Sequence, residues 1–323
     1  MRRVRYHEHG GPEVLAVEQA EVPEPGPGQV LIRTEAIGVN WVDVQLRRET
    51  SPGSIYFRPV PATLTGDVVG TVEAVGPGAD PALAGTRVAA LSEDAYADYV
   101  VAGADWLVRV PAGLDAGAAS MLPLAGPVAL GTLRAGRIAP GDTVLVTAGA
   151  GTIGHLAVQL ARLRGAGTVI ATAGPAKLGL AKELGADAAV DHTQPDWAEQ
   201  VRAAAPGGVD VALEAVGGEV LAQTIELLAP HGRAVVFGAS SGQMGTVPVR
   251  ALVKLKTVTG YSLLAARAIE PERVRSDVAE ISDLLEARRL RAETQTRLPL
   301  AEAARAHRLL EDRAVPGRIL LLP

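Results

Sequence analysis

The sequence has 323 residues and contains no cysteine. This absence excludes disulfide bonds, zinc sites with thiolate ligands and cysteine nucleophiles. Aromatic residues make up only 3% of the chain, too few for platforms on which nucleic-acid bases stack. No run approaches 18 apolar residues, so no segment is predicted to span a membrane.

The chain also lacks any excess of positive charge. Its formal net charge is −5, so we expect neither nucleic acid nor an anionic membrane surface as a partner. A content of 48% hydrophobic and 21% charged residues is ordinary for a globular enzyme, and the length favours two domains. A cytoplasmic enzyme is the expectation.

The most informative stretch runs from residue 142 to residue 177. A β-branched run at 143–147 predicts a buried parallel strand, and Gly149, Gly151 and Gly154 follow in G-x-G-x-x-G spacing. An apolar helical face then leads to a second strand at 168–172. A lone match is weak in a chain with 36 glycines, but a strand before and a helix after supply the confirming context. The stretch predicts a dinucleotide site, with the pyrophosphate at the helix N-terminus.

The end of the second strand favours NADPH over NADH. An enzyme for the unphosphorylated coenzyme would carry Asp or Glu about 20 residues after the motif, bonded to the ribose 2′-hydroxyl. Residues 172–177 contain no carboxylate, and small residues there leave room for a 2′-phosphate. Lys177 can supply a positive charge to that phosphate, or it is a solvated surface lysine.

The remaining pattern predicts two domains, one of them discontinuous. Residues 1–110 contain short strands with Pro and Gly turns, at 30–34, 68–75, 87–90, 96–101 and 106–110. Strands and helices alternate from 143 to 237 and predict a doubly wound parallel sheet. Helices are expected at 274–289 and 300–311, and a closing strand at 318–322 should return to the first domain. We therefore predict a catalytic domain of residues 1–118 and 262–323 around a coenzyme domain of residues 119–261.

The order of motifs resembles the zinc-independent quinone oxidoreductases, the zeta-crystallin-like branch of the medium-chain dehydrogenase/reductase superfamily. The resemblance covers essentially the whole chain. It implies a Rossmann domain inserted into a GroES-like β-rich domain. The motifs that carry it are GGPEVL at 10–15, GVNWVDVQLR at 38–47, GDVVGTVEAVG at 66–76, AGAGTIG at 148–154, LEAVGG at 213–218, FGASSG at 237–242 and PGRILLLP at 316–323.

Zinc ligands are missing from the positions at which the superfamily's zinc enzymes carry them. Asn40 stands where those enzymes place a zinc-ligating Cys, and Gly66, Asp67 and Val68 replace their GHE motif. No metal site is predicted. The one close histidine pair, His7 and His9, is interpreted as exposed strand residues, because no third ligand completes a site.

The resemblance also implies the site residues. Asn40 orients the nicotinamide ring or the substrate oxygen, unless it is only a polar turn residue. Many relatives carry a tyrosine where this chain has Gln45, and an amide can hydrogen-bond the product but cannot protonate it as a phenol can. Tyr56 is the alternative proton donor, or a surface aromatic. Asp67 either lines the site or, as the preferred interpretation, is a short polar residue that satisfies a turn. The implied coenzyme contacts are Asn40, Gly149, Ala150, Gly151, Thr152, Ile153, Gly154, Gly174, Lys177, His192, Val216, Phe237, Gly238 and Arg318, of which His192 and Arg318 could equally be a solvated loop histidine and an exposed strand arginine.

The chemistry that follows is hydride transfer from NADPH to a quinone or an activated C=C bond, as in an enone. One alternative is an enoyl-thioester reductase of fatty-acid or polyketide synthesis. Another, of a different class, is a non-catalytic NADPH-binding protein, either crystallin-like or a redox sensor. Relatives commonly pair as homodimers through the edge strand of the coenzyme domain, which residues 257–263 would form here.

Overall fold

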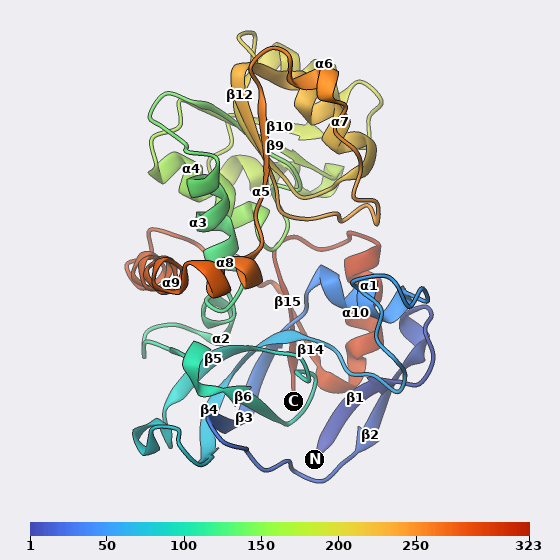
Figure 1. The fold of residues 1–323 in the computed structure, drawn as a ribbon, viewed down its shortest axis with the longest axis vertical. Helices are drawn as coiled ribbons and strands as arrows, with labels where there is room; N and C mark the ends of the chain where they lie inside the picture. The colour runs from blue at the N-terminus through green and yellow to red at the C-terminus, as the bar shows by residue number, and fades with distance from the viewer. The chain divides into compact units, whose positions relative to one another are not determined.

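A computed structural model describes all 323 residues, which form two compact units. The first consists of Met1–Leu124 and Ser282–Pro323, and the second of Ala125–Ile281 (Figure 1). The expected domain boundaries, 118/119 and 261/262, differ from these limits, most at the second boundary. Residues 262–281 group with the second unit because helix α8 (Leu263–Ile269) packs against α3 (Ala125–Ala135).

The first unit is built on a sheet in which the end of the chain takes part and in which all neighbouring strands are antiparallel except β14 and β15. The strand order is β14-β15-β3-β4-β5-β7, with β6 paired to β3. The closing strand β15 pairs with β3, so the expected return of the C-terminus is confirmed. A separate hairpin joins β1 (Arg2–Tyr6) and β2 (Leu15–Gln19). The strands of the large sheet are β3 (Gln29–Gly38), β4 (Gly66–Val75), β5 (Arg87–Ser92), β6 (Tyr99–Gly103), β7 (Val108–Arg109), β14 (Thr296–Pro299) and β15 (Ile319–Leu322).

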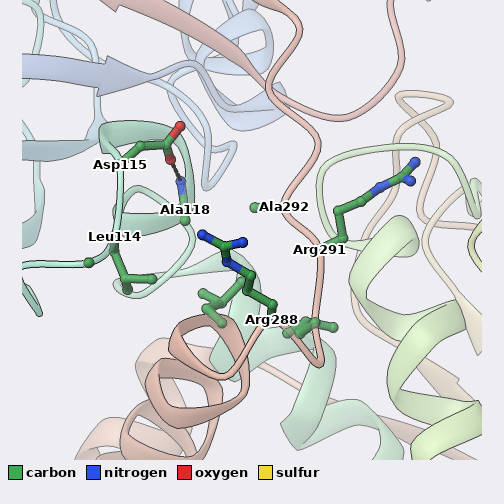
Figure 2. A pocket seen from close by; sticks show the side chains of 9 residues that line it. Leu114, Asp115, Ala118, Arg288, Arg291 and Ala292 are labelled. Atoms are coloured by element: carbon green, nitrogen blue, oxygen red, sulfur yellow. Dashed lines mark hydrogen bonds between the residues drawn. The ribbon is translucent and has the colours of Figure 1, made fainter.

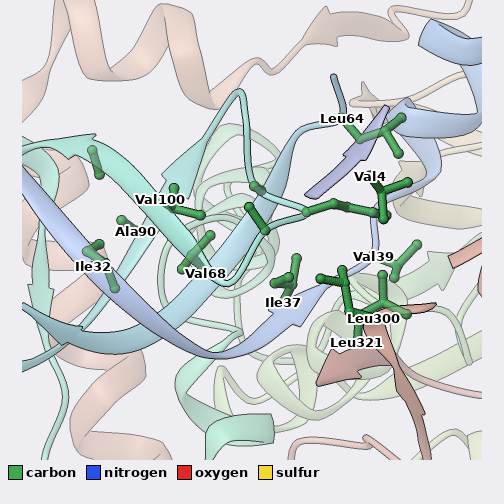
Figure 3. Close-up of a cluster of buried hydrophobic side chains, with 14 of the residues drawn as sticks. Val4, Ile32, Ile37, Val39, Leu64, Val68, Ala90, Val100, Leu300 and Leu321 are labelled. Carbon is green, nitrogen blue, oxygen red and sulfur yellow. The ribbon is translucent and has the colours of Figure 1, made fainter. Parts of the chain in front are cut away.

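The core of the first unit follows the period-2 pattern of these strands. Alternate residues such as Val30 and Ile32 in β3 point into one apolar cluster, and Val68 and Val72 join it from β4. Figure 3 shows residues of β15 and of the 300–302 turn in the same cluster. Segments from both ends of the chain therefore share one core.

The second unit contains a parallel sheet of six strands in the order β10-β9-β8-β11-β12-β13. Successive strands are added on one side of β8 and then on the other, which confirms the doubly wound topology. In such sheets ligands bind at the carboxyl ends of the strands where the order reverses, here beside β8. The strands are β8 (Thr143–Val146), β9 (Thr168–Ala173), β10 (Ala188–Asp191), β11 (Val209–Glu214), β12 (Leu228–Val236) and β13 (Thr257–Gly260).

Helices connect the parallel strands, as expected. Helix α9 (Pro271–Glu286) begins and ends three residues before the expected helix, because Pro271 suits a helix start and Arg288, with φ of 56°, no longer continues it. The expected strand at 106–110 begins later, since residues 104–106 form a 3₁₀ turn. No helix combines the length and the apolar character needed to cross a bilayer. The other helices are α1 (Trp41–Arg48), α2 (Ala116–Ala119), α4 (Gly154–Leu163), α5 (Leu178–Glu183), α6 (Trp197–Ala204), α7 (Gly218–Leu227) and α10 (Ala303–Glu311).

Candidate active site

The glycine motif of the second unit forms a tight turn between β8 and α4. Its backbone is held at both ends, because Gly149 N donates to Thr172 O at 2.8 Å and Gly151 N donates to Ala148 O at 2.9 Å. Ala148 adopts a left-handed φ of 52°, which turns the chain sharply after the strand. A Cβ atom at Gly154 would collide with the Ala148 carbonyl, so the first turn of α4 lies directly against this loop.

The N-terminus of α4 suits a pyrophosphate. No side chain caps the helix, and the N–H groups of His155 and Leu156 donate to the carbonyls of Gly151 and Ile153. The positive end of the helix dipole still favours an anion here. The residues of the turn before it differ in exposure, Ala150 being buried and Thr152 and Ile153 partly exposed. His155 Nδ1 donates to Gly151 O at 2.9 Å and thereby fixes the helix to the turn. These residues fit the coenzyme that the sequence predicts.

The end of β9 meets the end of β10 at a small, partly exposed site. Residues 175–177 form a single 3₁₀ turn after Gly174, and Lys177 is half-buried there. His192 N donates to Ala173 O at 3.3 Å, and an added Cβ on Gly174 would still lie 4.0 Å from the His192 ring. The structure therefore brings together three residues that the sequence analysis assigns to the 2′-phosphoadenosine end, Gly174, Lys177 and His192.

The turns that follow β11 and β12 are bonded to each other. Phe237 N donates to Glu214 O at 2.9 Å, and Ser241 N donates to Val216 O at 2.9 Å. Gly238 lies against Ala215, because a Cβ there would lie 3.0 Å from the Ala215 carbonyl oxygen. Val216, Phe237 and Gly238 thus form one surface at the carboxyl ends of neighbouring strands.

A buried carboxylate, absent from the sequence predictions, organises this surface. Glu214 accepts from Val216 N at 2.7 Å and from Gly217 N at 3.1 Å. Burial raises the pKa of Glu214, while the N–H groups of Val216 and Gly217 oppose that rise. The only local signal is an acidic residue at the end of a strand that is apolar apart from Asp210, which marks a buried charge that must be paired.

In the first unit, Asn40 stands at the start of α1 in a buried polar cluster. Its Nδ2 donates to Asp67 Oδ2 at 3.0 Å, and its Oδ1 accepts from Arg318 Nη2 at 2.6 Å. Arg318 also bonds the Asp67 carboxylate and the Ser120 carbonyl. The side chains of Asp67 and Arg318 are fully buried, so the ion pair is shielded from water.

This cluster corrects two sequence interpretations. Asp67 lies within β4 and is not a turn residue, and Arg318 is not an exposed strand arginine. Their pairing had no local signal, because 251 residues separate them in the chain. The guanidinium bonds Asn40, Asp67 and Ser120, and the contact of Arg318 with the coenzyme phosphates stays a prediction.

Asp43 supports the same helix start. Its carboxylate accepts from the backbone N of Asn40 at 3.3 Å, and from Thr65 N and Oγ1 at 2.8 and 2.7 Å. Burial raises the pKa of Asp43 to about 7, and the charge of Asp67 adds to that rise, while the bonds from Thr65 and Asn40 oppose it. The spacing of Asn40 and Asp43 is that of a helix N-cap and its third residue, a signal that would have predicted α1.

Gln45 and Tyr56 lie outside this cluster. Gln45 is partly buried in the second turn of α1, and Tyr56 is partly buried in the turn that follows the helix, where its N donates to Ser54 Oγ at 3.2 Å. The two histidines near the N-terminus follow β1 and are not strand residues. His7 pairs with Glu18, and His9 Nε2 bonds Arg58 O at 2.9 Å. No group of three or more His, Asp or Glu side chains is placed to hold a metal ion.

Each unit also has a pocket away from the predicted residues. One of about 370 Å³ in the first unit is lined by residues of 113–118 and 285–292, and Figure 2 shows Arg288 and Arg291 beside it. Another of about 450 Å³ in the second unit includes Arg134, Tyr261 and Asp277 in its lining. None of the predicted site residues lines either pocket.

Comparison with known proteins identifies both parts of the chain. Residues 26–112 match the family described as the alcohol dehydrogenase GroES-like domain. Residues 152–285 match the family described as zinc-binding dehydrogenase.

Similar proteins extend these matches over the whole chain. A 2-haloacrylate reductase from a Burkholderia species is 33% identical, over 98% of this chain and 97% of its own length. A quinone oxidoreductase from Pseudomonas aeruginosa is 32% identical, over 100% of this chain and 99% of its own. The structure of Escherichia coli quinone oxidoreductase complexed with NADPH aligns with a TM-score of 0.90 at 28% identity, covering 100% of both chains. The chain therefore belongs to the zinc-independent quinone oxidoreductase family of the medium-chain dehydrogenase/reductase superfamily.

Proposed function

We propose that the protein is an NADPH-dependent oxidoreductase that reduces a quinone or an activated C=C bond. The observation that carries this proposal is the glycine turn at 149–154, which leads into a helix N-terminus that no side chain caps. The strand that follows this helix, β9, ends without an acidic residue. Full-length relatives named quinone oxidoreductase and 2-haloacrylate reductase support the two acceptor classes.

The coenzyme would be held by the second unit at three places. The turn of Gly149, Ala150, Gly151, Thr152, Ile153 and Gly154 binds the pyrophosphate through main-chain N–H groups. Lys177 and His192 bind the 2′-phosphate. Gly174, the first residue after β9, leaves room for it. The surface of Val216, Phe237 and Gly238 receives the nicotinamide ribose and carboxamide. Bound NADPH supplies the hydride, and the protein supplies orientation and electrostatics.

Residues of the first unit act on the acceptor. Asn40 donates a hydrogen bond to the oxygen on which negative charge develops as the acceptor is reduced. Tyr56 supplies the proton that completes an enol or hydroquinone, and Gln45 donates a hydrogen bond to the same product but no proton. No strong acid is needed, because a conjugated acceptor spreads the charge of the incoming hydride.

A panel of acceptors tests this function. NADPH oxidation should be steady with quinones or with enones and 2-haloacrylate, and slower with NADH. An enoyl thioester in the same panel separates the alternative reductase, since activity on the thioester alone would replace the proposed acceptors. Binding of NADPH without oxidation by any acceptor would favour a non-catalytic sensor or crystallin-like role.

We also propose that the protein is a homodimer that acts in the cytoplasm. Strand β13 lies at the edge of the parallel sheet and pairs with β12 on one side only. The segment just before it exposes Val249, Val253 and Leu255, each more than 60% accessible. Light scattering should give about twice the 33.3 kDa of one chain, and a mass of one chain would end the dimer proposal.

A further inference from the structure

We infer that Arg318 is a positioning residue that locks and polarises the side-chain amide of Asn40 for hydride transfer. This inference rests on the proposed role of Asn40 toward the acceptor. It assigns to Arg318 a function through Asn40, distinct from a contact with the coenzyme phosphates.

The two neighbours of Asn40 leave only one orientation of its amide. Arg318 has only donors, so the Asn40 atom 2.6 Å from its Nη2 must be the oxygen Oδ1. The Asp67 carboxylate accepts, so the atom 3.0 Å from its Oδ2 must be the nitrogen Nδ2. A flipped amide would face donor to donor and acceptor to acceptor.

One N–H of Asn40 remains for a ligand once these bonds are counted. Nδ2 carries two hydrogens, and one of them is used by Asp67. Asn40 is 6% exposed, whereas Arg318 and Asp67 are fully buried. Of the three side chains, Asn40 is therefore the only one with exposed surface that a bound molecule can contact.

The guanidinium makes that remaining N–H a better donor. A charge-assisted bond to Oδ1 draws electron density from the amide, and hydrogen bonds in a low-dielectric site polarise one another in this way. A donor aimed at a developing oxyanion is among the largest contributions an enzyme makes to transition-state stabilisation. Because the Asp67 charge neutralises Arg318, the pair polarises the amide without leaving an unpaired buried charge.

The backbone around Arg318 is shaped to hold the guanidinium. Gly38, in the neighbouring strand β3, leaves the space it fills, since a Cβ there would collide with the Arg318 side chain. Ser120 O accepts from Nη1, and Arg318 N donates to Glu293 O at 2.8 Å. The side chain is thus fixed by three segments of the first unit.

Asn40 is the only asparagine in the chain, which makes the inference directly measurable. Protein labelled with ¹⁵N-asparagine gives a single pair of side-chain NH₂ signals in the NMR spectrum, without assignment. In the free wild-type protein the two hydrogens should have well-separated shifts that differ from those of free asparagine. Signals at free-asparagine positions would overturn the inference with no variant needed.

Variants then separate positioning from phosphate binding. Arg318→Lys should move the Asn40 signals and lower kcat about tenfold, with the Kd of NADPH within twofold of wild type. The exposed Arg291→Lys is the matched control and should change neither. If Arg318→Lys does not fold, Gly38→Ala displaces the guanidinium from the other side and should have the same effects.

Two results would overturn the proposal. Unmoved Asn40 signals in a folded Arg318→Lys or Gly38→Ala protein would show that Arg318 does not set the amide. A Kd for NADPH raised tenfold or more with kcat unchanged would make Arg318 a coenzyme ligand. The NMR measurement needs no turnover. Absence of activity with every acceptor would therefore refute the proposed function, while the NMR signals would still decide whether Arg318 fixes the amide of Asn40.

Discussion

The hydroxyl of Thr147 lies 3.5 Å from the carboxylate of Glu214, and it joins the ends of two neighbouring parallel strands. Thr147 Oγ1 also accepts from Ala215 N at 2.8 Å and donates to Leu213 O at 3.2 Å. Together with the N–H groups held by Glu214, these bonds define the backbone between β11 and α7. The nicotinamide end of the proposed coenzyme site therefore depends on two fully buried side chains.

Replacing Glu214 by Gln should loosen this turn. Gly217 N donates to both carboxylate oxygens, at 3.1 Å each, and Val216 N donates to Oε1, so in either orientation the NH₂ group of the amide would face the Gly217 N–H. We expect a loss of about 1–3 kcal/mol in unfolding free energy and a weaker affinity for NADPH. Urea unfolding and fluorescence titration measure the two effects. Glu219→Gln, on the exposed face of α7, is the control, and equal behaviour of both variants would refute the role of Glu214.

Replacing Gly154 by Ala should abolish coenzyme binding. The added Cβ would displace the Ala148 carbonyl and with it the turn that presents the main-chain N–H groups. Gly179→Ala is a matched control in α5, where a Cβ meets no atom within 4 Å. That variant should gain roughly 0.5–1 kcal/mol of stability, because alanine is the better helix former. Calorimetric titration with NADPH distinguishes them, and wild-type affinity in Gly154→Ala would show that the turn can relax.

The parts of the fold that sequence could predict are those with local signals. The glycine turn, the β-branched strands and the helices ending at Gly165 and Gly185 all carry their pattern within about 20 residues. The buried cluster at Asn40 could not be predicted in this way. Asp67 and Arg318 meet only because β4 and β15 both lie beside β3, and each residue alone resembles an ordinary surface charge.

The limits of the first unit differ from the expected ones for a similar reason. Residues 262–281 have the composition of helices that could cover either unit, and only packing decides between them. A glycine at position 131 admits the Tyr261 ring, which draws the following chain onto α3. Helix α1 is a different case, because it was not predicted although the spacing of Asn40 and Asp43 is a local signal for its start.

Replacing Lys177 by Ala should reduce the preference for NADPH over NADH. Lys177 is the cation beside the carboxylate-free end of β9, so its loss removes a charge-assisted contact with the 2′-phosphate alone. We expect the Kd of NADPH to rise about tenfold and that of NADH to change little. Lys182→Ala, near the C-terminus of α5, is the control. A parallel rise for both coenzymes would place Lys177 elsewhere than at the phosphate.

Replacing Tyr56 by Phe should lower kcat at least tenfold with unchanged affinity for NADPH. The phenol is the proposed proton donor, and general acids contribute roughly 10²–10⁴ in rate, part of which water would replace here. Tyr99→Phe, in β6 of the same unit, is the control. Stopped-flow measurement of NADPH oxidation decides the matter, and an unchanged kcat would leave protonation to water.

A buried histidine in the first unit should make the folded state sensitive to acid. His307 Nδ1 accepts from Arg47 Nε at 3.4 Å, so the proton of the neutral ring is on Nε2, which lies 3.2 Å from Tyr96 Oη. Burial lowers the pKa of His307 to about 3, with the Arg47 charge adding to the effect. Protonation of this ring would place a second cation beside Arg47 in a fully buried site.

The consequence is a loss of stability as the pH falls. Between pH 6.5 and 3 the unfolded chain binds a proton at His307 that the folded protein does not. His307 therefore leaves the free energy of unfolding unchanged above pH 6.5 and lowers it as the pH falls below 6.5. His307→Gln keeps an acceptor for Arg47 and a donor for Tyr96 but does not titrate. The wild type should therefore lose roughly 2.5 kcal/mol relative to this variant between pH 7 and pH 4.5. Asp43, whose pKa is raised to about 7, acts with the opposite sign, but it is present in both proteins and its effect cancels in the difference. Urea unfolding of both proteins at the two pH values measures that difference. If wild type and variant differ in unfolding free energy by the same amount at both pH values, His307 is protonated in the folded state as readily as in the unfolded chain.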